Sequence, residues 1–454
     1  MTALSRPIST APGARPVLGH LLPFLKQPFA FLAQLPEHGD AVRIRLGPKS
    51  AVVICDPGLT RKVLVDDRTF DKGGLFLERE REWLGDSVAT CPHSEHRRKR
   101  RLAQPAFHTQ RVAGYADTMT THIRSVVDGW QSGQVLDVCA EMFTITSRVF
   151  GATMFSSTLP AAVLNEVISD LTATFDGTFR RTLLPEPISR LPIPGTRRYD
   201  QANRRLRRTM NGIIADRRAS GIDNGDLLSA LLTAHDRENG RAATADGEVS
   251  DAVVTFFVAG TETTSSALAW VLYLLARHPD IEARLHAELD RELSGRPPGY
   301  GDVERLELAS RIVTETLRLY PPAWFFTRVV TARAQLGPYE LPAGCTVALS
   351  PYLIHRRADL YDEPDRFDPD RWLPERRMSS PTAHLPFGGG ARKCIGEAFG
   401  MTETVLALAV IASRWRLQTI PGGRRIHPPL SVSLVPGGLR LRLVDRRAAR
   451  QRQS

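Results

Sequence analysis

Phe387-Gly-Gly-Gly-Ala-Arg-Lys-Cys-Ile-Gly396 is the stretch of the chain that says most about its fold. The glycines 388–390 permit backbone angles that are closed to other residues, so the loop can turn tightly and lie close to a flat ligand. Cys394 stands just before a helical pattern that spans 397–414, and the positive end of a helix favours a thiolate. Arg392 is placed to pair with an anionic group of the ligand.

The chemistry of this loop favours iron over zinc. No second Cys or His stands at chelate spacing, whereas a single thiolate on a glycine bed suits the fifth ligand of a haem iron. The alternative is a buried cysteine in a glycine-rich turn. Every position of the pattern Phe-x-x-Gly-x-Arg-x-Cys-x-Gly is filled, and here the chain resembles the cytochrome P450 superfamily of haem-thiolate monooxygenases.

The resemblance implies the fold class, which is mainly α with a smaller β-rich lobe, the triangular helical prism of that superfamily. Residues 1–20 are rich in turn-forming Pro and Gly and are expected to form an irregular leader. We expect a single domain over 21–454, with strands mainly in 40–70 and 321–350 and helices mainly in 96–320 and 394–415. A terminal hairpin is expected over 430–444.

A second motif, Ala259-Gly-Thr-Glu-Thr-Thr264, lies inside an apolar helical pattern over 251–277. A glycine within a helix costs about 1 kcal/mol relative to alanine, and the Thr263 hydroxyl can bond to the carbonyl of Ala259. Alone, the motif also fits a small-residue packing patch. The resemblance implies that Thr263 and Glu262 are catalytic, orienting water and delivering protons to bound dioxygen, and that Gly260 lies beside the cofactor.

Glu315-Thr-Leu-Arg318 places opposite charges on one helical face. By itself this is a common surface ion pair. The resemblance implies a buried triad instead, with Arg371 of Phe367-Asp-Pro-Asp-Arg-Trp372 as its third member and a structural role. Asp370 and Trp372 stand where the family often has Glu and Phe, changes that keep the chemical type.

The resemblance also supplies cofactor contacts. It implies that Cys394 binds the haem b iron and that His96 and Arg100 contact one haem propionate. Arg328 and His355 are implied to contact the other propionate, with Arg392 in support. Cys91, His93 and His96 have a spacing that suggests zinc, but no fourth ligand is evident nearby. The cofactor-binding residues implied by the resemblance are His96, Arg100, Arg328, His355, Arg392, Phe387, Gly260 and Gly396.

The substrate regions of the family map onto apolar residues, with no charge to anchor a carboxylate or amine. The residues expected in the pocket are Phe175, Phe179, Phe256, Phe257, Trp324, Phe325 and Leu434. Each of them also fits plain core packing. The chain looks like actinobacterial terpenoid-pathway oxygenases, which implies a cyclic sesquiterpene such as pentalenene, oxidised at a methyl through an alcohol to an aldehyde in antibiotic biosynthesis. The alternatives are a fatty acid, a macrolide or another terpene, and a haem-binding protein without turnover.

Composition narrows the class of protein. The 454 residues are 42% apolar and 24% charged, typical of soluble globular proteins. The longest apolar run, 267–276, is shorter than the roughly 20 residues of a membrane-spanning helix. Five scattered cysteines form no disulfide framework. We therefore expect a cytoplasmic protein without a membrane span, in a reducing compartment.

The net charge of +11 is mostly arginine, which fits either a solvated surface or an acidic partner. The run His96-Arg-Arg-Lys-Arg-Arg101 lacks the aromatic interleaving of nucleic-acid-binding surfaces, so we expect no nucleic-acid partner. The resemblance implies electrons from NAD(P)H through ferredoxin reductase and ferredoxin. Arg97, Arg98, Lys99 and Lys393 are predicted to form a basic docking face for the ferredoxin on a monomeric enzyme.

Overall fold

The structure is a computed structural model that describes residues 6–156, 160–183, 194–239, 243–376, 383–421, 426, 428 and 431–446. Most of the described chain is helical. The longer helices are α4 (Leu75–Leu84), α5 (His93–Ala103), α6 (Thr109–Val127), α7 (Val138–Phe155), α8 (Ala161–Leu183), α10 (Pro194–Ser220), α11 (Leu227–Asn239), α12 (Ala243–Arg277), α13 (Pro279–Leu293), α14 (Glu307–Leu319) and α16 (Glu397–Arg414). Shorter helices are α1 (Leu21–Lys26), α2 (Pro28–Gln34), α3 (Pro57–Val65) and α15 (Pro351–Ile354).

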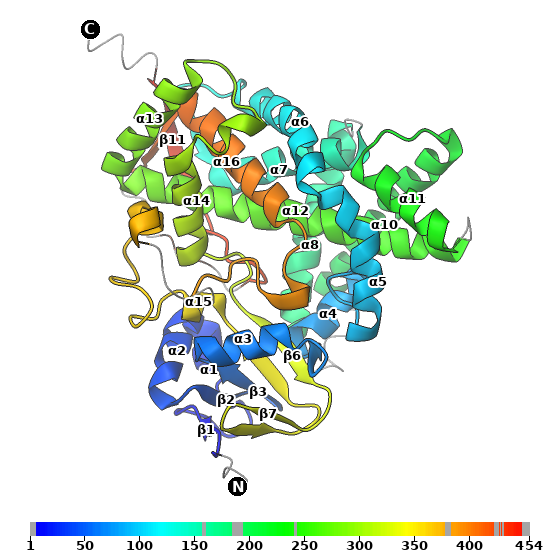
Figure 1. Cartoon of the computed structure of the whole chain (residues 1–454), viewed down its shortest axis with the longest axis vertical. Coiled ribbons are helices and arrows are strands. Elements are labelled where there is room, and N and C mark those ends of the chain that lie inside the picture. The colour runs from blue at the N-terminus through cyan, green and yellow to red at the C-terminus, as the bar shows by residue number, and fades with distance from the viewer. Residues whose placement is uncertain are drawn as a thin grey trace.

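The strands gather mainly in one lobe, as the chain pattern predicts (Figure 1). The six-stranded sheet has the order β1-β2-β3-β9-β6-β4. Its strands are β1 (Ser9–Thr10), β2 (Ala41–Leu46), β3 (Lys49–Ile54), β4 (Phe70–Lys72), β6 (Phe326–Val330) and β9 (Thr346–Leu349). Because β3 pairs with β9 and β4 with β6, the two ends of the chain form one sheet.

Two smaller sheets complete the described strands. The hairpin of β7 (Ala334–Leu336) and β8 (Tyr339–Leu341) extends the sheet lobe. The other sheet has the order β10-β11-β5 and joins β10 (Trp415–Thr419), β11 (Arg440–Asp445) and β5 (Val135–Asp137). The strand that follows α16, β10, therefore pairs within this smaller sheet beside the helical part of the molecule and does not join the large sheet.

The long helix α12 crosses the middle of the helical part, and α16 lies against it (Figure 1). The apolar faces of α6, α7 and α12 share one hydrophobic core, while α13, α14 and α16 enclose another with the C-terminal half of α12. Among the described residues, no helix combines the length and the hydrophobicity needed to cross a membrane. The helical frame thus fixes α12 and α16 relative to each other.

The leader is mainly irregular over the described residues 6–20, but β1 pairs with β2 and the backbone of Ala11 bonds to Arg43. The expected terminal hairpin is wrong, because β11 pairs with β10 and β5 and the described residues 431–438 contain no strand. This error concerns a pairing with distant segments, which local turn signals do not encode.

Candidate functional site

The glycine loop runs from the sheet lobe to the start of α16 and carries Cys394 at its end. Gly390 has a φ of +66°, and a Cβ there would lie 2.0 Å from the carbonyl oxygen of Leu64 in α3. The backbone N–H of Cys394 bonds to the carbonyl of Phe387 at 2.9 Å, which closes the loop. Gly396 is the residue before α16. The tight turn therefore holds Cys394 at the N-terminal end of a long helix.

The Cys394 thiol differs from the other cysteines of the chain. It is exposed, whereas Cys55 and Cys91 are buried. Surrounding protein nevertheless desolvates the sulfur and raises its pKa, although Gly396 N–H, Arg100 and Lys393 act to lower it. The Gly396 N–H at the start of α16 thus acts on the pKa of Cys394 in the expected direction, and burial outweighs it. A bound metal cation would overcome this, because a coordinating thiol loses its proton.

A group of buried cationic side chains lies near the loop. Arg328 is 5% exposed, and its one hydrogen bond within the described ranges goes to the carbonyl of Thr327 at 2.9 Å. Burial, and then the charge of Arg392, lower the pKa of Arg328 to about 10. Lys72 is paired with Arg328 across β4 and β6, and burial lowers its pKa to about 7. Donors buried without acceptors are a site for an anion.

His96 belongs to the same group. It is 5% exposed on α5. Burial, together with the charges of Arg392 and Arg100, lowers its pKa to about 4. The ring is therefore neutral near pH 7, and its N–H can donate to an anionic group. Sequence reasoning placed His96 and Arg328 here but missed Lys72, whose only signal is a register between strands.

Arg392, Arg100 and His355 are all implied to bind the cofactor, but their side chains also bond to other parts of the protein. All three nitrogens of Arg392 are bonded to protein, at 3.0 Å to Asp67, 2.9 Å to Asp71 and 2.9 Å to the carbonyl of Cys91. Arg100 bonds to the Lys393 carbonyl at 2.6 Å and so ties α5 to the loop.

His355 is the clearest correction. Its Nδ1 lies 3.0 Å from the carbonyl of Arg318, and its Nε2 accepts from the backbone N–H of Leu385 at 2.7 Å. The side chain is fully buried, and burial lowers its pKa well below the usual range. Because both ring nitrogens are occupied by main chain, we assign His355 to the support of the loop and not to a propionate.

The motif of α12 has the predicted local hydrogen bond. The hydroxyl of Thr263 donates to the carbonyl of Ala259 at 2.6 Å. Ala259 is exposed although its helical neighbours Val258 and Thr261 are buried. Gly260 makes room for Phe150 of α7, because a Cβ there would lie 2.2 Å from that ring. The exposed Ala259 marks a space beside α12 that described side chains do not fill.

Glu262 is the titratable group of this motif. Burial raises its pKa to about 8, and the negative charge of Glu80 adds to the rise, while a hydrogen bond with Ser433 opposes it. An acid with this pKa holds its proton at neutral pH. Glu262 is thus suited to give a proton, as a general acid must.

The predicted charge triad is confirmed. Arg318 donates to Glu315 at 2.8 and 2.9 Å, and Arg371 lies 3.5 Å from the same carboxylate. The carboxylate also accepts from Trp372 Nε1 at 2.9 Å and from the backbone of Asp368 at 3.1 Å. Glu315 and Arg318 are both 0% exposed. The triad clamps α14 to the segment that precedes the glycine loop.

Several expected pocket residues lie in hydrophobic cores. Phe257 is 0% exposed and packs against Phe150 at 6.0 Å between ring centroids. Leu434 is 1% exposed, and Trp324 is 4% exposed and donates to the carbonyl of Ser431. These three are corrected to core residues, because protein already covers their surface. Phe256 is nearly as buried, at 5%, and packs against Phe107.

The other expected pocket residues differ in their surroundings. Phe175 is half-buried and packs edge-on against Trp83. Phe325 lines a cavity of about 330 Å³ between the large sheet and the start of α4. The side chain of Phe179 lies outside the described residues. A cavity of about 510 Å³ lies between α3, α14, α16 and the glycine loop, and its lining includes Phe387 but neither Cys394 nor α12.

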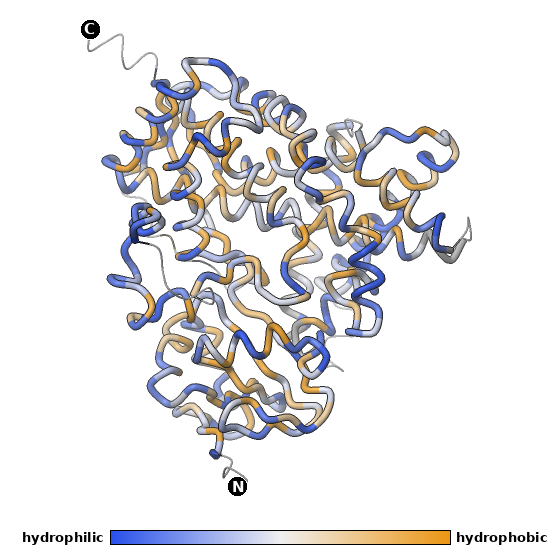
Figure 2. Tube along the Cα trace, in the orientation of Figure 1, coloured by the Kyte–Doolittle hydropathy of each residue, from blue (hydrophilic) through white to orange (hydrophobic). Residues whose placement is uncertain are grey.

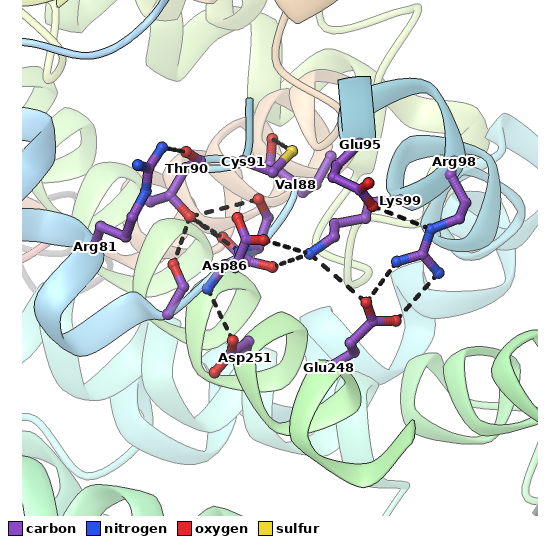
Figure 3. Close-up of polar contacts among 12 residues, drawn as sticks. Arg81, Asp86, Val88, Thr90, Cys91, Glu95, Arg98, Lys99, Glu248 and Asp251 are labelled. Carbon is purple, nitrogen blue, oxygen red and sulfur yellow. Dashed lines mark hydrogen bonds and ion pairs between the residues drawn. The ribbon is translucent and has the colours of Figure 1, made fainter. Parts of the chain in front are cut away.

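Most of the predicted basic docking face is paired with acidic side chains of the same chain. Arg98 is paired with Glu248, and Lys99 lies 3.2 Å from Asp86 and 3.8 Å from Glu248 (Figure 3). Arg98 is also paired with Glu238 of α11. Lys99 is only 9% exposed. These two residues bind α5 to α12 and to the segment between α4 and α5, so they are not free to meet a partner. The basic run belongs to α5, which is coloured as strongly hydrophilic in Figure 2. Acidic residues from other elements cover part of this helix.

The described residues fit an iron porphyrin. An exposed thiol at a helix start is suited to a soft axial ligand, and buried cationic donors suit the carboxylates of the porphyrin. The fold and this donor set define a haem-thiolate protein in which Cys394 would be the iron ligand, with His96, Arg328 and Lys72 near the propionates.

Comparison with known proteins agrees with this class. The family model for cytochrome P450 matches residues 10–441. The haem domain of cytochrome P450DA has a TM-score of 0.87 at 29% identity, covering 98% of this chain and 99% of that one. The chain belongs to the cytochrome P450 family.

Two relatives are named for terpenoid chemistry. The chain is 46% identical to cyclooctat-9-en-7-ol 5-monooxygenase of Streptomyces melanosporofaciens, over 91% of this chain and 90% of that protein. It is 42% identical to pentalenene oxygenase of Streptomyces avermitilis, over 96% and 97%. The resemblance predicted from the glycine loop and the three other motifs is thereby confirmed.

Proposed function

We propose that this cytochrome P450 inserts oxygen from dioxygen into a C–H bond of a cyclic terpene. The observation that carries the proposal is the exposed Cys394 at the start of α16 together with the exposed Ala259 of α12. The named activities of the similar proteins support a terpenoid substrate. Pentalenene, with stepwise oxidation of a methyl group in an antibiotic pathway, is one candidate within this class.

The residues of this chain position the substrate and deliver protons. When bound, haem b supplies dioxygen activation, which the cysteine ligand favours by releasing electron density. The Thr263 hydroxyl donates a hydrogen bond to the carbonyl of Ala259, and its oxygen can accept one from a water. Glu262, the preceding residue, can release a proton. Half-buried Phe175 and exposed Ala259 and Ala323 offer apolar surface.

A ligand titration tests the proposed substrate class. The haem-loaded enzyme is titrated with pentalenene, other cyclic terpenes, a long-chain fatty acid and a macrolide, and the low- to high-spin shift of the ferric haem is measured. We expect the shift with cyclic terpenes, since the apolar surface offers no charged anchor. A shift with the fatty acid or the macrolide and none with any terpene would overturn the substrate class.

Thr263→Ala tests the proton route. We expect substrate binding and NADPH use to persist while product falls and peroxide rises, because the variant loses the hydroxyl that orients water. Product and NADPH are measured together, with Thr261→Ala as the control. Thr261 bonds to the carbonyl of Phe257 in the same helix and is fully buried. Equal yield per NADPH in Thr263→Ala and wild type would contradict the route.

We also propose a ferredoxin-type electron donor fed by NAD(P)H, a monomeric enzyme and a cytoplasmic location. The surface of α5 that remains for a partner is smaller than predicted. Arg97 is exposed and makes no ion pair with any described residue, and Lys393 is exposed but paired with Glu397 at 2.5 Å. These two residues, in place of Arg98 and Lys99, which are paired with acids of the same chain, are the basic groups offered to an acidic donor.

A further inference from the structure

A turn at residues 15–19 presents apolar side chains to solvent. Among the described residues, five large apolar side chains are exposed, and three of them lie in this turn or in α1, which follows it. Val17 is 81% exposed, and Leu18 and Leu25 are 39% and 36% exposed. The backbone N–H of Leu21 bonds to the carbonyl of Leu18 at 3.1 Å, which joins the turn to α1. The side chains of Val17, Leu18 and Leu25 are together the apolar patch.

The backbone of this turn is firmly held and is unfavourable for valine. Val17 has a φ of +62°, a left-handed conformation that suits glycine or asparagine and is rare for a β-branched residue. Arg15 and Gly19 exchange two backbone hydrogen bonds, at 2.9 and 2.8 Å. A Cβ on Gly19 would lie 2.4 Å from the carbonyl oxygen of Arg45 in β2, so the turn lies directly on the sheet. Folding alone favours another residue at position 17, and an exposed valine there fits a contact outside the chain.

Unpaired cations surround the apolar patch. Arg15 lies in the turn, and Lys26 is the last residue of α1. Arg45 is held beside the turn, because its carbonyl accepts from the backbone N–H of His20 at 2.6 Å. Lys49 begins β3. All four cations are exposed, and none forms an ion pair with a described residue.

This lack of pairing contrasts with the rest of the molecule. Four arginines of α10 each meet a carboxylate, in the pairs Arg205–Asp170, Arg207–Asp251, Arg217–Asp226 and Arg218–Asp236. Residues 6–50, in comparison, contain six Lys and Arg but only two acids, Glu37 and Asp40. The positive charge is therefore in local excess around the apolar patch, and it is free to attract an anionic surface.

A cavity of about 330 Å³ adjoins the same turn. Leu46 pairs with Gly19 in an isolated β-bridge, and the backbone N–H of Gly47 bonds to the carbonyl of Leu18 at 3.0 Å. Leu46 also lines the cavity, together with Phe325 and Lys49. A surface that covers the apolar patch would therefore lie next to this cavity.

We propose that the apolar patch and the cations around it bind the surface of an anionic phospholipid bilayer. Aliphatic side chains that enter the headgroup region, with cations beside them, are the pattern of interfacial membrane binding. An acidic protein would satisfy the cations but would give no reason for exposed aliphatic side chains among them. A bilayer also dissolves an apolar terpene, which it would hold beside the cavity. Only this link to the substrate rests on the proposed function.

The charges and the apolar side chains should contribute separately to binding. Each Lys or Arg near an anionic leaflet strengthens binding about fivefold, so the loss of two cations should weaken it about 25-fold. Loss of the aliphatic groups of Val17 and Leu25 should weaken it about tenfold. Because salt screens exposed charges, we expect reversible binding that falls as the salt concentration rises.

The test measures vesicle binding of the haem-loaded protein by sedimentation, at low and high salt. Vesicles contain phosphatidylcholine alone, or phosphatidylcholine and phosphatidylglycerol in equal parts. One variant combines Val17→Asn with Leu25→Gln, and asparagine suits the positive φ at position 17. The other combines Arg15→Gln with Arg45→Gln. We expect wild type to bind the anionic vesicles, both variants to bind them less by the factors above, and no protein to bind phosphatidylcholine alone.

The controls separate this face from the charge and apolar surface of the whole chain. Ile222→Gln removes an apolar side chain that is 60% exposed beyond the end of α10. Arg197→Gln combined with Arg204→Gln removes two exposed arginines of α10 that have no ion pair in the described part of the chain. Both controls should bind like wild type. Circular dichroism and the haem spectrum verify that each protein is folded.

Several outcomes would overturn the proposal. These are a wild type that does not bind anionic vesicles, equal binding to phosphatidylcholine alone, and controls that lose as much binding as the variants. An apolar-patch variant that binds like wild type would also overturn it. If that variant does not fold, the Arg15 and Arg45 variant decides. Vesicle binding is measured without substrate, so its failure leaves the proposed function to the terpene titration.

Discussion

Replacing Cys394 with serine is expected to abolish the red-shifted absorption of the reduced carbonyl complex and all monooxygenase activity. The physical reason is the donor atom: a serine hydroxyl is far less acidic than a thiol and does not supply the soft, electron-releasing ligand that favours O–O cleavage. The tight turn at Gly390 positions this one side chain at the start of α16. No neighbouring cysteine can replace it, since Cys91 is buried with Arg392 bonded to its carbonyl.

The measurement is the difference spectrum of the reduced protein with and without carbon monoxide. Cys345→Ser serves as the matched control, because Cys345 is a half-buried cysteine of the sheet lobe. The control should keep the spectrum and the activity of wild type. A Cys394→Ser protein that keeps the red-shifted band would show that another residue binds the iron.

Features set by short spacings were predictable from the sequence. Thr263 reaches Ala259 because hydroxyls in helices meet the carbonyl four residues earlier. Glu315 and Arg318 pair because residues three apart share a helical face. The turn that carries Cys394 follows from glycine conformations within ten residues of sequence. In each case the partners are fixed by the geometry of one element.

Features set by the packing of distant elements were not predictable in this way. Arg98 and Lys99 read as a free basic run until α12 brings Glu248 against them. Whether Phe257 lines a pocket or lies in the core depends on which face of α12 packs against α7. Lys72 gains its place from its register with Arg328. Spacing along the chain does not contain these relations, so the place of Lys72 in the cation group emerged only from the structure.

The buried triad behind the loop provides the second large effect. Glu315→Gln keeps the volume of the side chain and removes its charge, which leaves Arg318 and Arg371 as uncompensated buried cations. Removing one partner of a buried ion pair costs about 3–5 kcal/mol. Since whole domains are stable by about 5–15 kcal/mol, we expect a large fall in the free energy of unfolding and poor retention of haem.

Glu363→Gln is the matched control for this prediction. Glu363 and Arg366 have the same three-residue spacing and the same 2.8 Å separation as Glu315 and Arg318, but their side chains are 69% and 64% exposed. Exposed pairs contribute about 0–1 kcal/mol, so the control should stay close to wild type in urea unfolding followed by haem absorbance and circular dichroism. Because Glu315 is buried and is also bonded by Arg371, Trp372 and the Asp368 backbone, the gap between the variants measures what the whole buried network adds beyond an exposed ion pair. Equal stability of Glu315→Gln and Glu363→Gln would show that α14 is held to the segment before the loop by packing and not by the charge network.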